Sequence, residues 1–316
     1  MPFSTLDRLA DRYADVSLSN QRMLRTFAAV AGQLRAQRIR FLILKGGDLL
    51  TRLYGHFGSR PLADIDLLLD GNSIPALHTL MLENAFLPQL DGNPAYRSSD
   101  GSLALDVCTD IWYLPDAKEL WARATRRTVN GTDVCAMGST DLLIYLILYA
   151  VVHRGTVSGT LHSDLQLLLR KEPPDWELLL DLASAPHIRI PLYTGLNILI
   201  PDLVPPSVLS TLAPTSCVDH ARCRLLTQLV VGRPIPDLGH FLLWLFAPQG
   251  HRWQYLLKRL FPSKEFLAWR YGTKASAGTA VRLFRVASLS SNATRLLTRI
   301  TGRLVTGGAS SYDRVP

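Results

Sequence analysis

Hydrophobic and polar positions along the first third of the chain predict helix, strand, helix and strand in succession. Residues 20–37 carry apolar side chains at helical spacing, which predicts an amphipathic helix. An apolar run at residues 41–44 predicts a strand, and residues 48–54 return to helical spacing. The sequence Asp64-Ile65-Asp66 then opens a second apolar run, which predicts the next strand.

The pattern changes character after a further predicted strand at residues 103–111. From residue 139 onward the apolar spacing is helical and prolines are frequent. The longest apolar run covers residues 142–152, and it predicts a buried helix because a membrane span takes ~20 residues. We therefore expect a mixed α/β (α+β) fold, with a small mixed sheet followed by an all-helical domain.

These changes predict four parts of the chain. Residues 1–40 form a helical segment that packs on the sheet, residues 41–135 form the sheet domain, residues 136–270 form the helical domain, and residues 271–316 form a basic tail.

Composition and charge narrow the class of protein. The chain has 316 residues, of which 47% are hydrophobic and 19% charged, as expected of a folded protein with substantial cores. The net charge of +8 comes mainly from the tail, which has seven basic residues and one acid from Tyr271 onward. We interpret the tail either as a helix packed on the body or as a contact to an anionic surface, lipid or polymer.

Two further features predict the compartment. The four cysteines form no C-x-x-C pair, which favours reduced thiols. The first twelve residues lack the apolar core of a signal peptide. We expect a cytoplasmic protein without integral membrane association.

The candidate chemistry lies in the acids of the predicted strands. Asp64 and Asp66 are two residues apart, so they project from one face of a strand. Two carboxylates this close repel each other unless a cation lies between them, and oxygen ligands suit Mg²⁺. Asp106 is the candidate third carboxylate if its strand neighbours theirs, and Asp110, four residues on and facing the same way, is the alternative.

Several motifs resemble one family. They are Gly46-Gly47 before a helix, L-K-G at residues 44–46, Tyr54, R-P-x-x-D-I-D-L-L at residues 60–68, and F-P-S-x-E-F at residues 261–266. Together they resemble the bacterial "uncharacterised nucleotidyltransferase" family, within the superfamily that includes DNA polymerase beta-type enzymes. The resemblance covers most of residues 20–271 and implies that the sheet domain is a nucleotidyltransferase palm.

The resemblance implies a reaction and its cofactors. A nucleoside monophosphate would pass from an NTP such as ATP to a hydroxyl on a small molecule, peptide or RNA, with two Mg²⁺ ions. Asp64 and Asp66 would bind both ions, and Asp106 would bind the ion nearest the attacking hydroxyl. A tailoring step in peptide natural-product biosynthesis is the setting that the family suggests.

The resemblance also implies how the nucleotide is held. Gly46 and Gly47 would let backbone N–H groups approach the phosphates, with Lys45 and Arg60 as cationic partners. Asp48 departs from the superfamily pattern, because an acid near a triphosphate is unfavourable unless it faces away or caps the helix. His153 and Asp164 either border the cleft or form a structural hydrogen bond.

Two other functions stay open. A catalytically inactive module would bind a nucleotide or sugar phosphate without chemistry, and clustered carboxylates argue against it. A toxin-like nucleotidyltransferase that modifies tRNA is the other, and the basic tail is the feature that suggests it.

Overall fold

The computed structural model describes residues 5–90, 94–111, 113–114, 117–261 and 278–306, and they form two compact units. The first unit comprises residues 1–112, 116–142 and 167–173, and the second comprises residues 113–115, 143–166 and 174–316. Of the motif at residues 261–266, only Phe261 falls within the described residues, and residues 271–277 and 307–316 of the tail also lie outside them.

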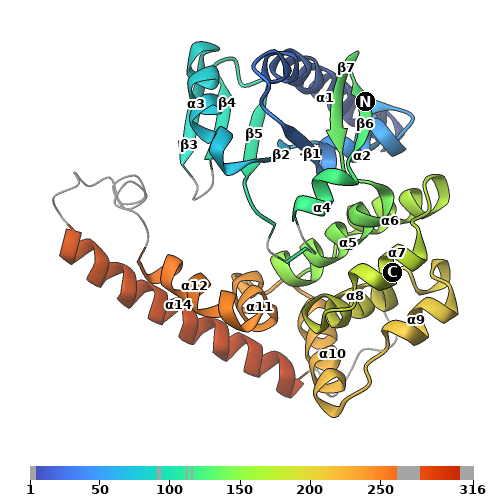
Figure 1. The fold of residues 1–316 in the computed structure, drawn as a ribbon, viewed down its shortest axis with the longest axis vertical. Coiled ribbons are helices and arrows are strands. Elements are labelled where there is room, and N and C mark those ends of the chain that lie inside the picture. Colours follow the sequence, from blue (N-terminus) through green and yellow to red (C-terminus); the bar gives the residue numbers. More distant parts are fainter. Residues whose placement is uncertain (1–4, 91–93, 112, 115–116, 262–277, 307–316) are drawn as a thin grey trace. The chain divides into compact units, whose positions relative to one another are not determined.

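The first unit is built on a seven-stranded mixed sheet with the order β3-β4-β5-β2-β1-β7-β6 (Figure 1). The strands are β1 (Phe41–Leu44), β2 (Ile65–Leu69), β3 (Phe86–Leu90), β4 (Pro94–Ser98), β5 (Ala104–Cys108), β6 (Thr125–Val129) and β7 (Thr132–Ala136). β1 pairs with β2 antiparallel and with β7 parallel, and β2 pairs with β5 parallel. The outer pairs β3–β4, β4–β5 and β6–β7 are antiparallel.

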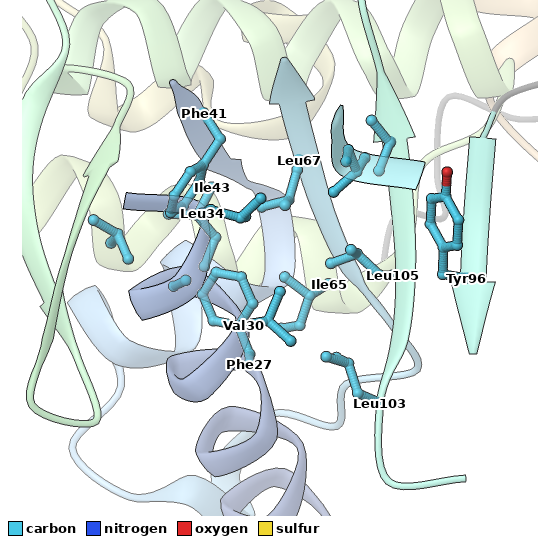
Figure 2. Packing of buried hydrophobic residues seen from close by; sticks show 14 of the residues in the cluster. Phe27, Val30, Leu34, Phe41, Ile43, Ile65, Leu67, Tyr96, Leu103 and Leu105 are labelled. Atoms are coloured by element: carbon cyan, nitrogen blue, oxygen red, sulfur yellow. The ribbon is translucent and has the colours of Figure 1, made fainter. Parts of the chain in front are cut away.

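The described part of this unit also contains helices and 3-10 turns that lie wholly within it. They are α1 (Thr5–Ala36), α2 (Lys45–Leu53), α3 (Ile74–Glu83), α4 (Ala117–Ala122), and 3-10 turns at Phe57–Ser59 and Gly71–Ser73. The second half of α1 is amphipathic, and its apolar residues join the core of the sheet (Figure 2). Phe27 and Phe41 meet edge to face with ring centroids 6.3 Å apart.

The described part of the second unit is helical. It contains α7 (Trp176–Leu182), α8 (Pro186–Leu199), α9 (Pro206–Leu212), α10 (Cys217–Val230), α11 (Leu238–Phe246), α12 (Gln249–Leu260), α14 (Gly278–Thr306) and a 3-10 turn at Pro201–Leu203. The boundary with the first unit falls within α5 (Ser139–Leu148) and α6 (Gly159–Lys171), and a π-helical segment at Tyr149–Arg154 follows α5. None of the helices in the described ranges combines the length and the hydropathy needed to cross a membrane.

The expected mixed α/β class is confirmed, and the structure corrects several details. The helix expected at residues 20–37 begins fifteen residues earlier, because α1 starts at Thr5 with an exposed, polar half. The pattern does not predict β3, β4, β6 and β7, which are short and carry polar or exposed residues. The four cysteines are free in the structure.

Glycine at position 47 is required by the packing of α2 on the sheet. A Cβ there would lie 2.8 Å from Cδ1 of Ile65 and 3.0 Å from Cδ1 of Ile43. Gly47→Ala should therefore lower the free energy of unfolding by about 1–3 kcal/mol, measured by chemical denaturation. Gly32→Ala is the matched control: it has open space around it in α1, so it should be neutral or stabilise by up to ~1 kcal/mol. Equal stability of the two variants would contradict this packing.

Candidate active site

The register of β2 and β5 brings two predicted acids together. Asp66 of β2 and Asp106 of β5 are direct partners in the parallel pairing of these strands. Asp64 lies just before β2, so it is at the same end of the strand as Asp66. Asp110 lies beyond Cys108, where β5 ends, and has no partner in β2. The structure therefore places Asp64, Asp66 and Asp106 close together. Asp110 lies beyond the end of β5 and is not paired with a residue of β2.

The alternation of side chains along β2 decides which face these acids occupy. Ile65 and Leu67 belong to the core that α1 helps to form, and so do Leu105 and Val107 of β5. Because successive residues of a strand point to opposite faces, Asp66 and Asp106 project from the other face of the sheet.

Lys45 is the cation that the structure places against these acids. Its Nζ lies 2.6 Å from Oδ1 of Asp66, and both side chains are mostly buried. Burial raises the pKa of Asp66; Lys45 opposes this rise, and the charges of Asp64 and Asp106 add to it. The raised pKa shows that the ammonium of Lys45 does not outweigh burial, the largest cause, together with the smaller effect of the neighbouring charges.

The donor chemistry of the three acids suits a divalent metal ion. Carboxylate oxygens that repel one another are the ligands that Mg²⁺ prefers, so Asp64, Asp66 and Asp106 fit such an ion chemically. However, among the residues that the structure describes, no three His, Cys, Asp or Glu side chains converge tightly enough to hold a metal as they stand. The ammonium of Lys45 holds the position beside Asp66.

The glycine pair lies inside a helix and not in a turn before it. α2 begins at Lys45, whose φ of +46° is in the left-handed region that lysine rarely adopts. Gly46 and Gly47 therefore occupy the first helical turn, where backbone N–H groups have no acceptor within the helix. The residue before the helix, Leu44, makes no side-chain capping bond to them. Such a helix start is a suitable place for an anion.

Arg60 packs against this helix start. A Cβ at Gly46 would lie 2.6 Å from Nη1 of Arg60 and 2.9 Å from Leu62, so glycine is what lets the guanidinium approach α2. The structure thus brings Arg60 to the same place as Lys45 and the first N–H groups of α2. These cationic and donor groups lie next to the clustered acids.

A residue that the sequence interpretation does not identify holds the loop containing Arg60. Asn20 of α1 is buried, and its Nδ2 donates to the carbonyl oxygens of Phe57 at 2.6 Å and of Arg60 at 2.8 Å. Its Oδ1 accepts from the backbone N–H of Leu62 at 3.1 Å. One amide therefore fixes residues 57–62, which lead directly to Asp64. The sequence signal for this role was the position of Asn20, a polar residue at helical spacing from the apolar residues of the helix predicted at residues 20–37.

Asp48, which departs from the superfamily pattern, is directed into a buried ion-pair network. Its Oδ2 lies 3.2 Å from Nη1 of Arg52, which also donates to Met137 O. Glu172 accepts from both Arg52 and Arg127 at 2.6 Å. Burial raises the pKa of Asp48 to about 6, because it outweighs the attraction of an arginine whose shorter bonds go to Glu172.

The two outlying candidates belong to the second unit. His153 lies at the end of the π-helical segment, with its ring 5.0 Å from that of Tyr149 and 5.8 Å from that of Tyr113. Asp164 is buried on α6. Their place relative to the acids of the first unit stays a prediction.

Comparison with known proteins gives one family and several similar folds. The model of the family described as "uncharacterised nucleotidyltransferase" matches residues 1–199. An antigenic nucleotidyltransferase-like protein from Paracoccidioides brasiliensis is 22% identical, with a TM-score of 0.43, over 62% of this chain and 96% of that one. The antibiotic-resistance factor ANT(2'')-Ia is 17% identical, with a TM-score of 0.37, over 52% of this chain and 89% of that one. The search of curated proteins found no match.

The Asn20 clamp predicts a local effect on the loop. Asn20→Asp keeps the acceptor for Leu62 N–H but removes both donors and places a negative charge against two carbonyl oxygens. We expect a loss of about 2–4 kcal/mol in the free energy of unfolding, because two carbonyl oxygens lose their partner and a charge is buried. Hydrogen exchange at residues 57–62 should also become faster. Asn72→Asp, the same change at an exposed site, should alter neither quantity. Unchanged exchange in Asn20→Asp would contradict the clamp.

The raised pKa of Asp48 predicts a pH-dependent stability. The native pKa of about 6 exceeds the unfolded value of 3.8, so the native state binds more protons between these values. This contribution is complete below pH 4 and is lost as the pH rises through 6. Relative to Asp48→Asn, the wild type should therefore lose up to about 3 kcal/mol of stability between pH 4 and 7. Denaturation at each pH measures the difference, and Asp15→Asn, at an exposed site, is the control. A constant difference for Asp48→Asn would contradict the assignment.

Proposed function

The chain belongs to the uncharacterised nucleotidyltransferase family, and from this we propose that its first unit transfers a nucleoside monophosphate from an NTP to a hydroxyl acceptor. The observation that carries the proposal is the pairing of Asp66 with Asp106 across β2 and β5, with Asp64 beside them. Family membership supports a transferase, and this geometry supports the residues we assign to it.

The three acids would hold the divalent ions. Asp64 and Asp66 are the candidate ligands of two Mg²⁺ ions, and Asp106 is the candidate ligand of the ion nearer the acceptor. When bound, such ions neutralise the charge that develops on the attacking and leaving oxygens. We prefer Asp106 to Asp110 because only Asp106 lies opposite Asp66 in the sheet.

The start of α2 would hold the triphosphate. The first N–H groups of α2 and the guanidinium of Arg60 lie together there. Gly46 contributes by leaving room for Arg60, and Gly47 by letting α2 pack closely on the sheet. Because the carboxylate of Asp48 is directed into the buried ion-pair network with Arg52, it would leave the phosphate position to cationic groups.

The reaction itself is an in-line displacement. The acceptor oxygen forms a bond to the α-phosphorus, and the bond from that phosphorus to the bridging oxygen breaks, which releases pyrophosphate. In this proposal Asp106 would help to accept the hydroxyl proton as the oxygen attacks. The acceptor stays open between a small molecule, a peptide and RNA, and the peptide natural-product setting stays a prediction.

One observation favours the alternative of a nucleotide-binding module without chemistry. The ammonium of Lys45 already pairs with Asp66, so this carboxylate has a cation within the protein. A module of this kind would be stabilised by a nucleotide equally with and without Mg²⁺, whereas the transferase would need the metal.

A transfer assay tests the proposal. Purified protein is incubated with each α-labelled NTP, Mg²⁺ and a cell extract, and label should move onto an acceptor. Asp66→Asn and Asp106→Asn should each lower the rate by roughly 10³-fold, because charge stabilisation in the transition state is lost.

Asp110→Asn is the matched control, because it removes a carboxylate of the same kind four residues beyond Asp106. This variant should retain activity. Full activity of Asp66→Asn would contradict the mechanism. Absence of transfer, together with thermal stabilisation by nucleotide without Mg²⁺, would establish the binding module instead.

A further inference from the structure

The second unit contains an open pocket between α8 and α10 (Figure 1). Arg189 and Thr194 of α8 hold the two helices together: Nη2 of Arg189 lies 2.8 Å from Oδ2 of Asp219, and the hydroxyl of Thr194 donates to Sγ of Cys223 at 3.3 Å. The pocket has a volume of about 630 Å³, which is the size of a site for a small organic molecule. Its lining includes Tyr193, Pro214, Cys217, His220, Cys223 and Arg224.

The helix α10 turns one side to the pocket and the other into the protein. Cys217, His220 and Arg224 are three and four residues apart, so they follow one another along one side of the helix. Asp219 and Leu226 are buried, and at 100° per residue they lie on the opposite side. The packing of α10 therefore fixes which of its polar groups line the pocket.

Arg224 gives the pocket a positive charge without a counter-ion. Its guanidinium makes no ion pair or hydrogen bond with the residues that the structure describes, and none of the described acids lines the pocket. Asp219, on the buried side of α10, is paired with Arg189. An anionic group of a ligand would therefore complement Arg224, and a guanidinium can bind a carboxylate or a phosphate through two parallel hydrogen bonds.

His220 and Tyr193 add groups that can recognise a hydroxyl. Nδ1 of His220 lies 2.9 Å from the carbonyl oxygen of Ser216, which only accepts, so Nδ1 carries a proton. In the neutral ring, Nε2 is then the acceptor for a hydroxyl of a ligand. The hydroxyl of Tyr193 also has no hydrogen-bond partner within the described part of the chain, and its ring and Pro214 supply apolar surface.

The thiols and the imidazole of α10 are spaced too widely for a shared metal ion. Cys217 and Cys223 are six residues apart, which is about 9 Å along a helix, whereas two thiolates on one zinc ion each need a bond of ~2.3 Å. In the ranges that the structure describes, no three such side chains form a metal-binding group. The pocket therefore fits an organic molecule better than a metal ion.

We propose that this pocket binds a small hydroxylated organic anion, with its carboxylate or phosphate on Arg224 and a hydroxyl on Nε2 of His220. The family match ends at residue 199, so the lining contributed by α10 lies beyond the part of the chain that the family model covers. The pocket belongs to the second unit alone. The proposal does not rest on the proposed function of the first unit.

Calorimetric titration of the full chain with small probe molecules tests this. Ribose 5-phosphate carries a phosphate and hydroxyls, gluconate carries a carboxylate and hydroxyls, and ribose carries hydroxyls alone. We expect at least one of the two anions to bind with a Kd of about 1 mM or below, and ribose to bind at least about tenfold more weakly. The bound anion should also slow the alkylation of Cys217 by iodoacetamide, measured by peptide mass spectrometry, because Cys217 lines the same pocket.

Two arginine variants locate the bound anion. Arg224→Gln should weaken binding roughly 10-fold or more, because the charge-assisted hydrogen bonds to the anion are lost. Arg222→Gln is the matched control: it removes the same charge from α10 at a position that does not line the pocket, so it should bind like the wild type.

Four results would overturn the proposal. They are unchanged binding by Arg224→Gln, binding that leaves the alkylation of Cys217 unaltered, absence of binding by both anions at about 10 mM, and binding of inorganic phosphate as tight as that of the best organic anion. The last result would show an ion on Arg224 without recognition of the rest of a ligand.

Discussion

The alternation of side chains along the central strand β2 is the constraint on which the rest of the first unit depends. Ile65, Leu67 and Leu69 face the core that α1 contributes to, so Asp66 must face the other way. A shift of one residue would turn the acid into this apolar core and move the three apolar side chains to the face where Lys45 lies. The free energy of the core therefore fixes the direction of Asp66. The parallel pairing with β5 applies the same rule to Asp106.

The helix α1 contacts both the core that orients β2 and the loop that precedes β2. Its apolar residues, such as Phe27 and Leu34, pack in the core, while Asn20 on the same helix binds three backbone groups of residues 57–62. The helix that contributes to the core of the sheet therefore also holds the loop. Sixteen residues separate Gly47 from Asp64, and this clamp explains how such a long connection can still deliver Arg60 and Asp64 to defined positions.

The sequence predicts the centre of the fold better than its edges, for a physical reason. β1 and β2 are central and almost fully buried, and β5 beside them buries one face, so all three are largely apolar and the pattern predicts them. β6 and β7 lie at one edge, where TRRTV and TDVCA carry charges that do not reveal a strand. The Asn130-Gly131 pair between them has positive φ at both residues, and this pair was the available signal for a hairpin.

The residues of the candidate site also divide into those that the sequence predicts and those that it does not. The faces of Asp66 and Asp106 could be predicted because strand periodicity fixes them. That they meet was predicted only on the condition that their strands are neighbours, which the pairing of β2 with β5 fulfils. The roles of Gly46 and Gly47 could not be predicted, because they depend on contacts with Arg60, Ile43 and Ile65 from other elements. The partners of Asn20 and Lys45 are 20 or more residues away, which no local pattern encodes. Asp48 pairs with Arg52 at i,i+4 spacing, but Arg52 also binds Met137 and Glu172, which are 85 and 120 residues away.

The pairing of Lys45 with Asp66 connects the acids proposed to bind the metal ions with the start of α2, which is proposed to bind the triphosphate. Without a cation, the three acids would repel one another on one face of the sheet, and the ammonium of Lys45 relieves part of this repulsion. Under the proposed function, an ion bound through Oδ1 of Asp66 would take the place of the ammonium of Lys45. The triphosphate at the start of α2 would then be the anion that pairs with this ammonium, so a bound nucleotide would compensate its displacement. The proposed function therefore implies that metal and nucleotide bind cooperatively, each raising the affinity for the other by the same factor.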